Sequence, residues 1–441
     1  MFGIYKVEYV CVRGLIYPLC GNRKQVDQNR PECRRSTKFL TVARPKSIKS
    51  ELVINAISAQ HGGIVTYTLN LIRHMRKSGL TGKVYVPPPF FDRIDEKERD
   101  RVSLVNVDLS GLGSLKRLFW EQLNWRRVVK NSGASVLYSS ANYGLIRPPI
   151  PQILMIQGEI SFNPYYQEAV LPRLSRLERV SFALRRRLVR WSMRHSDIVL
   201  FPSETALKSV VGNDPELARR SRVNYLCAED GLKNLKSTRT WREDGVLKTL
   251  YISVYYPHKD PLTLIRAIRK LRDSGTNAIA RITMKDQDFT HWSSGPGELK
   301  KMRASENNDF VFLDHIPHKD IDTELNQHDV LVSTSLAETF GFPLVESMAA
   351  GVPVIATDVP IHREICGDAA LYFKPQDSED LATQLMKLDK DPDLRATLVK
   401  RGHARASDMY GWSRHLQILG DCVTSLSGKP NDKHQPSRKT L

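Results

Sequence analysis

The sequence has no run of eighteen apolar residues, which is about the length that a transmembrane helix requires. Its first twenty residues contain Lys6, Glu8 and Arg13 and therefore lack the unbroken apolar segment of a secretory signal peptide. Cysteine is scarce, and the six cysteines form no Cys-x-x-Cys pair, no Cys/His spacing typical of a zinc site and no disulfide framework. We therefore expect a cytoplasmic protein with reduced cysteines.

Positive charge, in contrast, is abundant. The 441 residues include 66 Lys+Arg and 48 Asp+Glu, so the formal net charge is +18. This excess indicates an anionic partner, which could be nucleic acid, an anionic membrane surface or a phosphorylated substrate. With 41% hydrophobic residues the chain is typical of globular proteins, which excludes global disorder, and its length suggests two or three domains.

Short apolar segments alternate with segments of helical period through most of the chain. Helices are predicted over Ile64–Lys77 and Pro261–Arg272, where apolar residues recur on one face. The predicted strands are Leu52–Ile57, Val84–Val86, Ser135–Tyr138, Ile153–Ile156, Ile198–Phe201, Thr249–Val254, Arg281–Met284, Phe310–Leu313, Val330–Ser333 and Val352–Ala356. This alternation predicts an α/β fold with parallel sheets that are covered by helices on both faces.

A polar segment without a period, between Cys227 and Val246, divides the chain. We predict two doubly wound, Rossmann-like domains over residues 50–228 and 229–409, which face each other across a ligand-binding cleft. Residues 1–49 are expected to form a basic, poorly ordered extension, residues 410–427 a helix that packs back on the N-terminal domain, and residues 428–441 a disordered tail.

The segment Val330–Ala356 is the most informative for function. It predicts a strand, a loop that contains glycine, and a short helix with Pro343 at its first position and Gly351 at its end. The free backbone N–H groups around Gly341–Leu344 would suit an anion such as phosphate.

Two carboxylates, Glu338 and Glu346, flank this anion site. They would repel phosphate but can accept hydrogen bonds from hydroxyl groups. A sugar nucleotide, which carries both phosphates and hydroxyls, satisfies the whole arrangement. Alternatively, Glu338 is an exposed loop acid and Glu346 an acid that interacts favourably with the helix dipole.

The spacing Glu338-x7-Glu346, with Phe-Gly-Phe-Pro between and Ala-Ala-Gly-Val-Pro-Val-Ile-Ala after, resembles the signature of the retaining glycosyltransferases of family 4 (glycosyl transferases group 1). The resemblance covers residues 50–415 and is strongest over 309–375. It implies the GT-B architecture, with the acceptor on the N-terminal domain and the nucleotide sugar on the C-terminal domain. It also implies that Glu338 contacts the transferred sugar as a catalytic residue and that Glu346 contacts the nucleotide ribose. The diphosphate would be held by the backbone of Phe340, Gly341, Phe342 and Leu344.

A second candidate site lies at Lys259, just before a predicted helix start at Asp260 and Pro261. By the same resemblance Lys259 matches a phosphate-contacting lysine and is assigned as catalytic. Val254 stands where the family often has an arginine. Taken without this context, Lys259 would be an ordinary surface lysine.

Two further loops are candidates for the cleft. Gly62 and Gly63 follow the first predicted strand and would let the backbone approach the donor closely, or they mark only a turn. Gln157 occupies the position where the family often has a histidine at the sugar end of the cleft, and Glu159 is a nearby acid. Both of these residues could equally be simple loop residues.

Two basic segments fall in the N-terminal half, Leu171–His195 and Lys116–Lys130. In the first, the apolar residues that recur at helical spacing, and that we expect to face the core, are Leu177, Val180, Leu184, Leu188 and Trp191. Arginines fill much of the remainder. The segments favour attraction to an anionic leaflet that carries a lipid-linked acceptor, or they form ordinary amphipathic helices with a solvated basic face.

We therefore predict a cytoplasmic glycosyltransferase, peripheral on the inner face of the membrane, that retains the anomeric configuration. Its partners would be a nucleotide diphosphate sugar and a glycan or lipid-linked acceptor in cell-surface polysaccharide or lipopolysaccharide assembly. No cofactor or metal is expected, because the Asp-Gln-Asp run at Asp286–Asp288 lies outside the motifs of the donor site. A sugar-nucleotide epimerase on the same fold and a nucleic-acid-binding protein are the alternatives, although no RNP-like, zinc-finger or KH-like motif is present.

Overall fold

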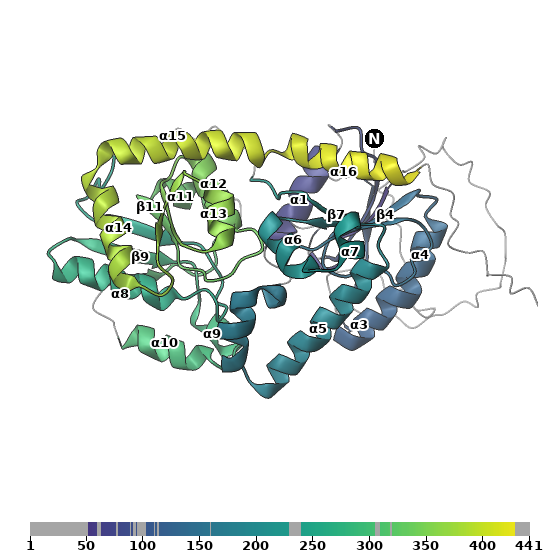
Figure 1. Ribbon diagram of the computed structural model, residues 1–441, viewed down its shortest axis with the longest axis horizontal. Helices are drawn as coiled ribbons and strands as arrows, with labels where there is room; N and C mark the ends of the chain where they lie inside the picture. The colour runs from purple at the N-terminus through teal and green to yellow at the C-terminus, as the bar shows by residue number, and fades with distance from the viewer. Residues whose placement is uncertain are drawn as a thin grey trace, which may run out of the picture.

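The computed structural model describes residues 52–427, except 60–62, 76–77, 89, 91–93, 95–102, 110, 113, 159, 229–239, 305–308 and 318–319. The predicted extension (1–49) and tail (428–441) lie outside the described residues. Two parallel sheets, each with helices on both faces, lie side by side (Figure 1). The prediction of an α/β fold with two doubly wound sheets is confirmed.

The first sheet has seven parallel strands in the order β3-β2-β1-β4-β5-β6-β7. Its strands are β1 (Leu52–Asn55), β2 (Gly82–Val86), β3 (Ser103–Asn106), β4 (Val136–Ser139), β5 (Gln152–Met155), β6 (Ile198–Phe201) and β7 (Ser221–Val223). The accompanying helices are α1 (Gly63–Met75), α3 (Ser114–Trp120), α4 (Arg126–Asn131), α5 (Arg176–Arg194), α6 (Glu204–Val211) and α7 (Pro215–Arg220). A π-helical turn, Glu121–Trp125, joins α3 to α4.

The second sheet has six parallel strands in the order β10-β9-β8-β11-β12-β13. Its strands are β8 (Leu247–Tyr251), β9 (Ala278–Ile282), β10 (Phe310–Phe312), β11 (Val330–Ser333), β12 (Val354–Thr357) and β13 (Ala370–Phe373). Its helices are α8 (Pro261–Asp273), α9 (Asp286–Thr290), α10 (Gly295–Arg303), α11 (Ile321–Asn326), α12 (Phe342–Ala350), α13 (Pro360–Cys366), α14 (Ser378–Lys390) and α15 (Pro392–Met409).

The observed strands differ from the prediction at their ends and at the sheet edges. β1 ends at Asn55 rather than Ile57, because the Asn55 side chain accepts a hydrogen bond from the Ile57 backbone and starts a turn. β8 ends at Tyr251, and the Ser253 backbone N–H donates to the hydroxyl of Thr283 instead of continuing the ladder. Three strands, β3, β7 and β13, were not predicted. They are edge strands and therefore short and only partly buried.

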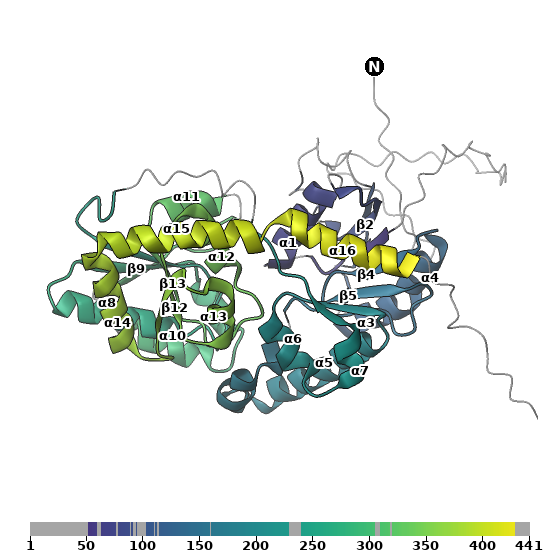
Figure 2. The ribbon, with the colours of Figure 1, turned by 45° about the horizontal axis from the view of Figure 1, so that its top comes forward.

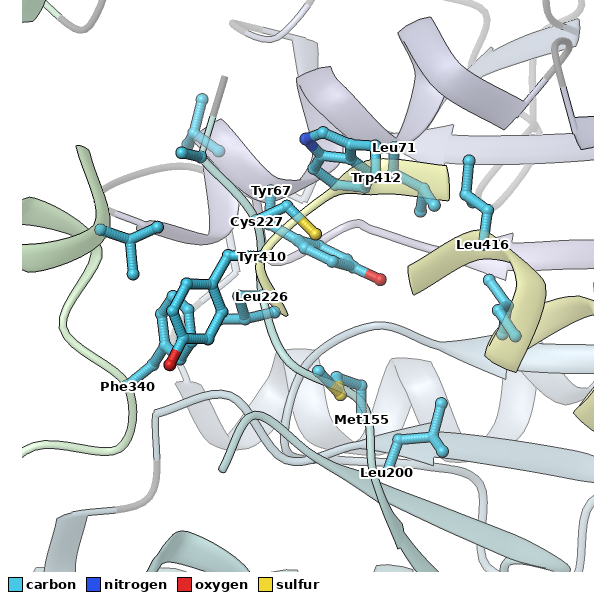
Figure 3. Close-up of a cluster of buried hydrophobic side chains, with 14 of the residues drawn as sticks. Tyr67, Leu71, Met155, Leu200, Leu226, Cys227, Phe340, Tyr410, Trp412 and Leu416 are labelled. Carbon is cyan, nitrogen blue, oxygen red and sulfur yellow. The ribbon is translucent and has the colours of Figure 1, made fainter. Parts of the chain in front are cut away.

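A hydrophobic core continues from one sheet to the other beneath the C-terminal helix α16 (Trp412–Ser427). Figure 3 shows Phe340 and Tyr410 at one end of this cluster, Tyr67 and Trp412 near each other in its middle, and Leu416 at the other end. The ring centroids of Phe340 and Tyr410 are 5.6 Å apart, and those of Tyr67 and Trp412 are 5.8 Å apart. α16 packs against α1 and β4, so it returns from the second domain to the first (Figure 2).

One prediction about α5 is wrong. The helix begins at Arg176, after a separate 3-10 turn at Leu171–Arg173, and its side chains that pack into the protein are Phe182, Val189, Ser192 and Met193. The stripe that we expected in the core is exposed instead, apart from the half-buried Leu188. The helix has two apolar faces, and helical spacing does not tell which of them packs against the sheet.

Candidate active site

Both sheets have a topological switch point, where the strand order reverses direction. It lies between β1 and β4 in the first sheet and between β8 and β11 in the second. Open parallel sheets bind ligands beyond the carboxyl ends of the strands at such points. A cavity of about 1020 Å³ lies there, and residues that follow β1, β4, β5, β8 and β11 line it. The cavity therefore receives side chains from both domains.

All the predicted site residues that the structure describes line this one cavity. They are Gly63, Gln157, Lys259, Glu338, Phe340, Gly341, Phe342, Leu344 and Glu346. Gly62 and Glu159 were also predicted, but they lie outside the described residues.

Gly341 is the N-cap residue of α12. Its φ of 97° lies in the left-handed region, and a Cβ at this position would stand 3.0 Å from Leu344 Cδ1, so both backbone and space favour glycine. α12 begins at Phe342, which makes Pro343 the second helical residue rather than the predicted first. Proline still fits there, because the first N–H groups of a helix have no partner within it.

Gly63, the first residue of α1, closely approaches the start of α12. A Cβ on Gly63 would lie 3.0 Å from Cε2 of the Phe342 ring. The first turns of a helix from each domain therefore face the same cavity. A helix start is the positive end of the helix dipole, and its first N–H groups have no partner in the preceding turn of the helix, so the two starts together favour an anionic ligand.

Lys259 and Glu338 form an ion pair in the cavity wall, between Nζ and Oε1. Their side chains are only 15% and 18% exposed. The backbone carbonyl of Lys259 accepts hydrogen bonds from the hydroxyls of Tyr251 (2.6 Å) and Thr334 (2.9 Å), so the ends of β8 and β11 hold this loop. Burial alone would raise the pKa of Glu338, but the Lys259 ammonium outweighs it and holds that pKa below its usual value.

His258 precedes the lysine and also lines the cavity. Burial lowers its pKa to about 3, so the imidazole is neutral. Within the described part of the chain, its Nδ1 has no hydrogen-bond partner. His258 therefore offers the cavity a polar group that a ligand could use.

Asp260 is the N-cap residue of α8, as predicted, but with a left-handed backbone (φ 46°). Its Oδ2 accepts a 2.6 Å hydrogen bond from the hydroxyl of Thr263. Burial raises the pKa of Asp260 to about 7, and the nearby Glu298 adds to this, whereas Thr263 and Arg266 oppose it. Asp260 therefore titrates near neutrality, next to the Lys259–Glu338 pair.

This pKa predicts how stability depends on pH. Because the pKa is higher in the folded state than the unfolded value of about 3.9, protonated Asp260 contributes stability that is fully present below that value and is lost as the pH rises through about 7. Each unit of pKa elevation corresponds to about 1.4 kcal/mol. We expect Asp260→Asn, which tolerates the left-handed backbone, to remove this decline in urea unfolding measured from pH 5 to 8. The exposed control Asp273→Asn at the end of α8 should keep it; equal pH profiles for both variants would contradict the assignment.

Two further positions bear on the predicted donor site, Glu346 and Val254. Glu346 lies on the second turn of α12 and is only 4% exposed, so it is a buried carboxylate in the cavity wall rather than a surface acid. Val254 also lines the cavity and is 41% exposed. The position where the family often has an arginine is thus inside the site, and here it carries no charge.

The two domains together build an aromatic wall of the cavity, which was not predicted from the sequence. Ring centroids of Tyr166 and Tyr256 lie 5.5 and 5.6 Å from that of His258, and those of Phe182 and Trp292 are 6.3 Å apart. These residues come from four separate segments of the chain, so no local sequence pattern predicts that they lie together. Only Tyr256 and His258, which precede Lys259 by three positions and one position, were close to a recognised motif.

Polar contacts join the domains at the cavity edge. The Thr339 hydroxyl donates to the Gln157 carbonyl (2.6 Å), and the Ser203 hydroxyl donates to the Thr339 carbonyl (2.7 Å). The Gln157 side-chain nitrogen donates to the Ser140 carbonyl (2.8 Å), which fixes its loop. Glu364 of α13 accepts hydrogen bonds from the first turn of α6, including the Thr205 hydroxyl at 2.6 Å.

Both aspartates of the Asp-Gln-Asp run are paired within the protein, Asp288 with a residue that lines the cavity. Asp286 pairs with Arg303 (2.8 Å), and Asp288 pairs with His315 (2.9 Å). Among the described residues, no group of three or more His, Cys, Asp or Glu side chains could hold a metal ion. The three described cysteines, Cys227, Cys366 and Cys422, are free and buried. Nor, over the same residues, is there a helix long and apolar enough to cross a membrane.

Two family models match the chain. The model of Glycosyl transferases group 1 matches residues 237–405, and that of Glycosyltransferase Family 4 matches residues 61–224. The first range includes Lys259, Glu338 and Glu346, and the second includes Gly63 and Gln157.

The chain is also similar to individual glycosyltransferases and to solved structures. O-antigen chain mannosyltransferase B of Escherichia coli is 30% identical over 101 residues, or 23% of this chain, and the chain spans only 26% of that relative's length. The uncharacterized glycosyltransferase MJ1178 of Methanocaldococcus jannaschii is 22% identical over 386 residues, which is 83% of this chain and 95% of that protein. The crystal structure of Anabaena Alr3699/HepE in complex with UDP and glucose covers 85% of this chain and 99% of its own, with 17% identity and a TM-score of 0.65.

Proposed function

Because this chain belongs to the glycosyltransferases of family 4 and group 1, we propose that it transfers a sugar from a nucleoside diphosphate sugar to an acceptor hydroxyl, with retention at the anomeric carbon. The observation that carries the proposal is the Lys259–Glu338 pair, which stands in one cavity with the starts of α1 and α12. A cation and two helix starts suit a diphosphate, and carboxylates suit sugar hydroxyls. The UDP and glucose in the Anabaena structure of the same fold support this choice of donor.

In the proposed mechanism, donor binding exchanges one ion pair for another. The diphosphate takes Lys259 and the N–H groups at the start of α12, which releases Glu338 to accept hydrogen bonds from the sugar. Glu346, buried on α12, binds the nucleotide ribose. Negative charge that develops on the departing diphosphate is then stabilised by the Lys259 ammonium and by backbone N–H donors that are already in position.

Transfer itself needs one bond to form and one to break. The acceptor oxygen bonds to the anomeric carbon on the face that the diphosphate leaves, and the bond from that carbon to the phosphate oxygen breaks. The acceptor proton passes to the leaving phosphate oxygen. The chain's contribution is to position both substrates and to stabilise the leaving group, so no cofactor takes part.

We assign the acceptor to the N-terminal domain and expect a glycan or a lipid-linked glycan. The relative in Escherichia coli, an O-antigen mannosyltransferase, supports a role in cell-surface polysaccharide or lipopolysaccharide assembly. We expect the enzyme to work in the cytoplasm at the inner face of the membrane, and not on nucleic acid.

The reaction is tested by proton NMR on mixtures of this enzyme, a sugar nucleotide and a candidate acceptor. We expect a new glycosidic product whose anomeric configuration equals that of the donor. A product of inverted configuration would contradict the retaining mechanism. An epimerised sugar nucleotide, formed without any acceptor product, would support the epimerase alternative instead.

The proposed electrostatics also predict the response to chelators. We expect turnover to be unchanged by excess EDTA and by added Mg²⁺ or Mn²⁺, because Lys259 and the helix N–H groups meet the charge of the diphosphate. If EDTA stops the reaction and metal restores it, the account of the leaving group is wrong. Asp286 and Asp288 would then be the first residues to replace.

A further inference from the structure

Helix α5 presents an apolar stripe to solvent. One side of the helix packs into the first domain through Phe182, Val189 and Met193. The stripe on the opposite side recurs every three to four residues. It consists of Leu177, which is 84% exposed, Val180 and Leu184, both 58%, the half-buried Leu188, and Trp191, 47%. Isolated exposed apolar residues are ordinary, but a stripe four turns long indicates an interaction site.

The rest of the exposed surface of α5 is basic. Seven of its 19 residues are arginines, and Glu178 is its one acid. Hydrogen bonds from Ser175 and Ser293 engage Glu178 and lower its pKa to about 2. Within the ranges that the structure describes, none of the seven arginines forms an ion pair. Arg185 and Arg190 lie over the rings of Phe182 and Phe162, and the charge of the other five is available to an external partner.

We propose that this outer face of α5 binds an anionic lipid bilayer. A helix with an apolar stripe flanked by arginines lies in the plane of the membrane interface, where the stripe enters the boundary between headgroups and acyl chains. The arginines keep their charge at the level of the lipid phosphates while their stems cover apolar surface. The high positive charge beside the stripe favours a bilayer over a second copy of this chain, which would carry the same charge.

Helix α5 connects the proposed bilayer-binding surface with the cavity of the candidate active site. Figure 1 shows the helix along the lower edge of the molecule, between the first domain and α9. Its first turns also line the cavity, through Glu178, Ser181, Phe182 and Arg185. A bilayer bound to the outer face would place the cavity beside the membrane. A lipid-linked acceptor could then enter the cavity, an inference that rests on the proposed function.

The binding surface is tested without any sugar donor, so the result does not depend on the transfer reaction. The full chain is floated with vesicles of phosphatidylcholine alone or with phosphatidylglycerol added. Two variants alter exposed residues of α5 only. One is the triple variant Arg179→Gln, Arg187→Gln, Arg194→Gln, and the other is the double variant Leu177→Gln, Leu184→Gln.

We expect binding to the anionic vesicles and not to the neutral ones. Each arginine near an anionic surface is worth about a fivefold change in affinity, so the triple variant should bind about 100-fold more weakly. The double variant should bind about tenfold more weakly or worse, at any salt concentration. Matched controls on the second domain are Lys387→Gln, Lys390→Gln, Lys400→Gln for charge and Val311→Gln for apolar exposure, and these should bind like the wild type.

Two results would overturn the proposal. The first is wild-type binding that is absent or that both α5 variants retain. The second is a wild-type dimer in sedimentation that the double variant abolishes while vesicle binding stays unchanged, which would make the stripe a contact between two copies. Unchanged circular dichroism spectra would show that the exposed substitutions leave the fold intact.

Discussion

Lys259→Ala is expected to slow sugar transfer by a factor on the order of 10² or more, because it removes a preorganised charge that stabilises the leaving diphosphate. The effect should be large here, since Val254 stands in the same cavity where a second cation could have compensated. The loss should appear in kcat with saturating donor as well as in donor affinity. Lys259→Arg keeps the cation and should retain more activity than alanine.

Two controls separate this effect from a loss of stability. Lys270→Ala removes another lysine of an ion pair, with Glu379, but at an exposed site on α8, and should leave turnover unchanged. Thermal unfolding should show whether Lys259→Ala is folded at the assay temperature, because it leaves Glu338 partly buried without its partner. A folded Lys259→Ala variant with wild-type kcat would refute the role of the lysine.

The second large effect is a division of roles between the two glutamates. Glu338→Gln should abolish transfer while nucleoside diphosphate binding stays unchanged or becomes tighter, since the variant frees Lys259 for the phosphates. Glu346→Gln should weaken nucleotide binding by about 10- to 100-fold, as expected for one lost hydrogen bond to a charged acceptor. Isothermal titration calorimetry with the nucleoside diphosphate measures both.

The outcome of this pair distinguishes the ion-pair exchange from a general electrostatic effect. Both substitutions remove one negative charge from the same cavity, so each serves as the charge-matched control of the other. Equal losses of nucleotide affinity in the two variants would contradict the assigned roles. A Glu338→Gln variant that binds nucleotide much more weakly than the wild type would contradict the competition for Lys259.

Much of the arrangement could be predicted from the sequence, because local patterns determine it. The alternation of apolar and helical segments predicts parallel sheets, and ligand loops in such sheets follow the carboxyl ends of strands. Lys259, Glu338 and Gly63 follow or lie close after β8, β11 and β1, so the topology alone brings them to one cavity.

The features that could not be predicted depend on contacts between distant segments. Lys259 and Glu338 are 79 positions apart, and their individual motifs do not indicate that they pair. Glu364 belongs to the region of the family resemblance, yet it caps α6 in the other domain rather than facing the cavity. On α5, helical spacing reveals two apolar faces, but only the packing of Phe182 and Val189 decides which one is left to solvent.

We propose that the cavity between the two sheets binds a nucleoside diphosphate at Lys259, Glu346 and the start of α12. A thermal-shift screen of the common nucleoside diphosphates against the wild type and Glu346→Gln tests it most directly. We expect one nucleotide to stabilise the wild type, by about 2.7 kcal/mol when its concentration is 100 times the Kd, and to stabilise the variant far less at the same concentration. If no nucleoside diphosphate stabilises the wild type, or if one stabilises both proteins equally, the proposed donor site is wrong.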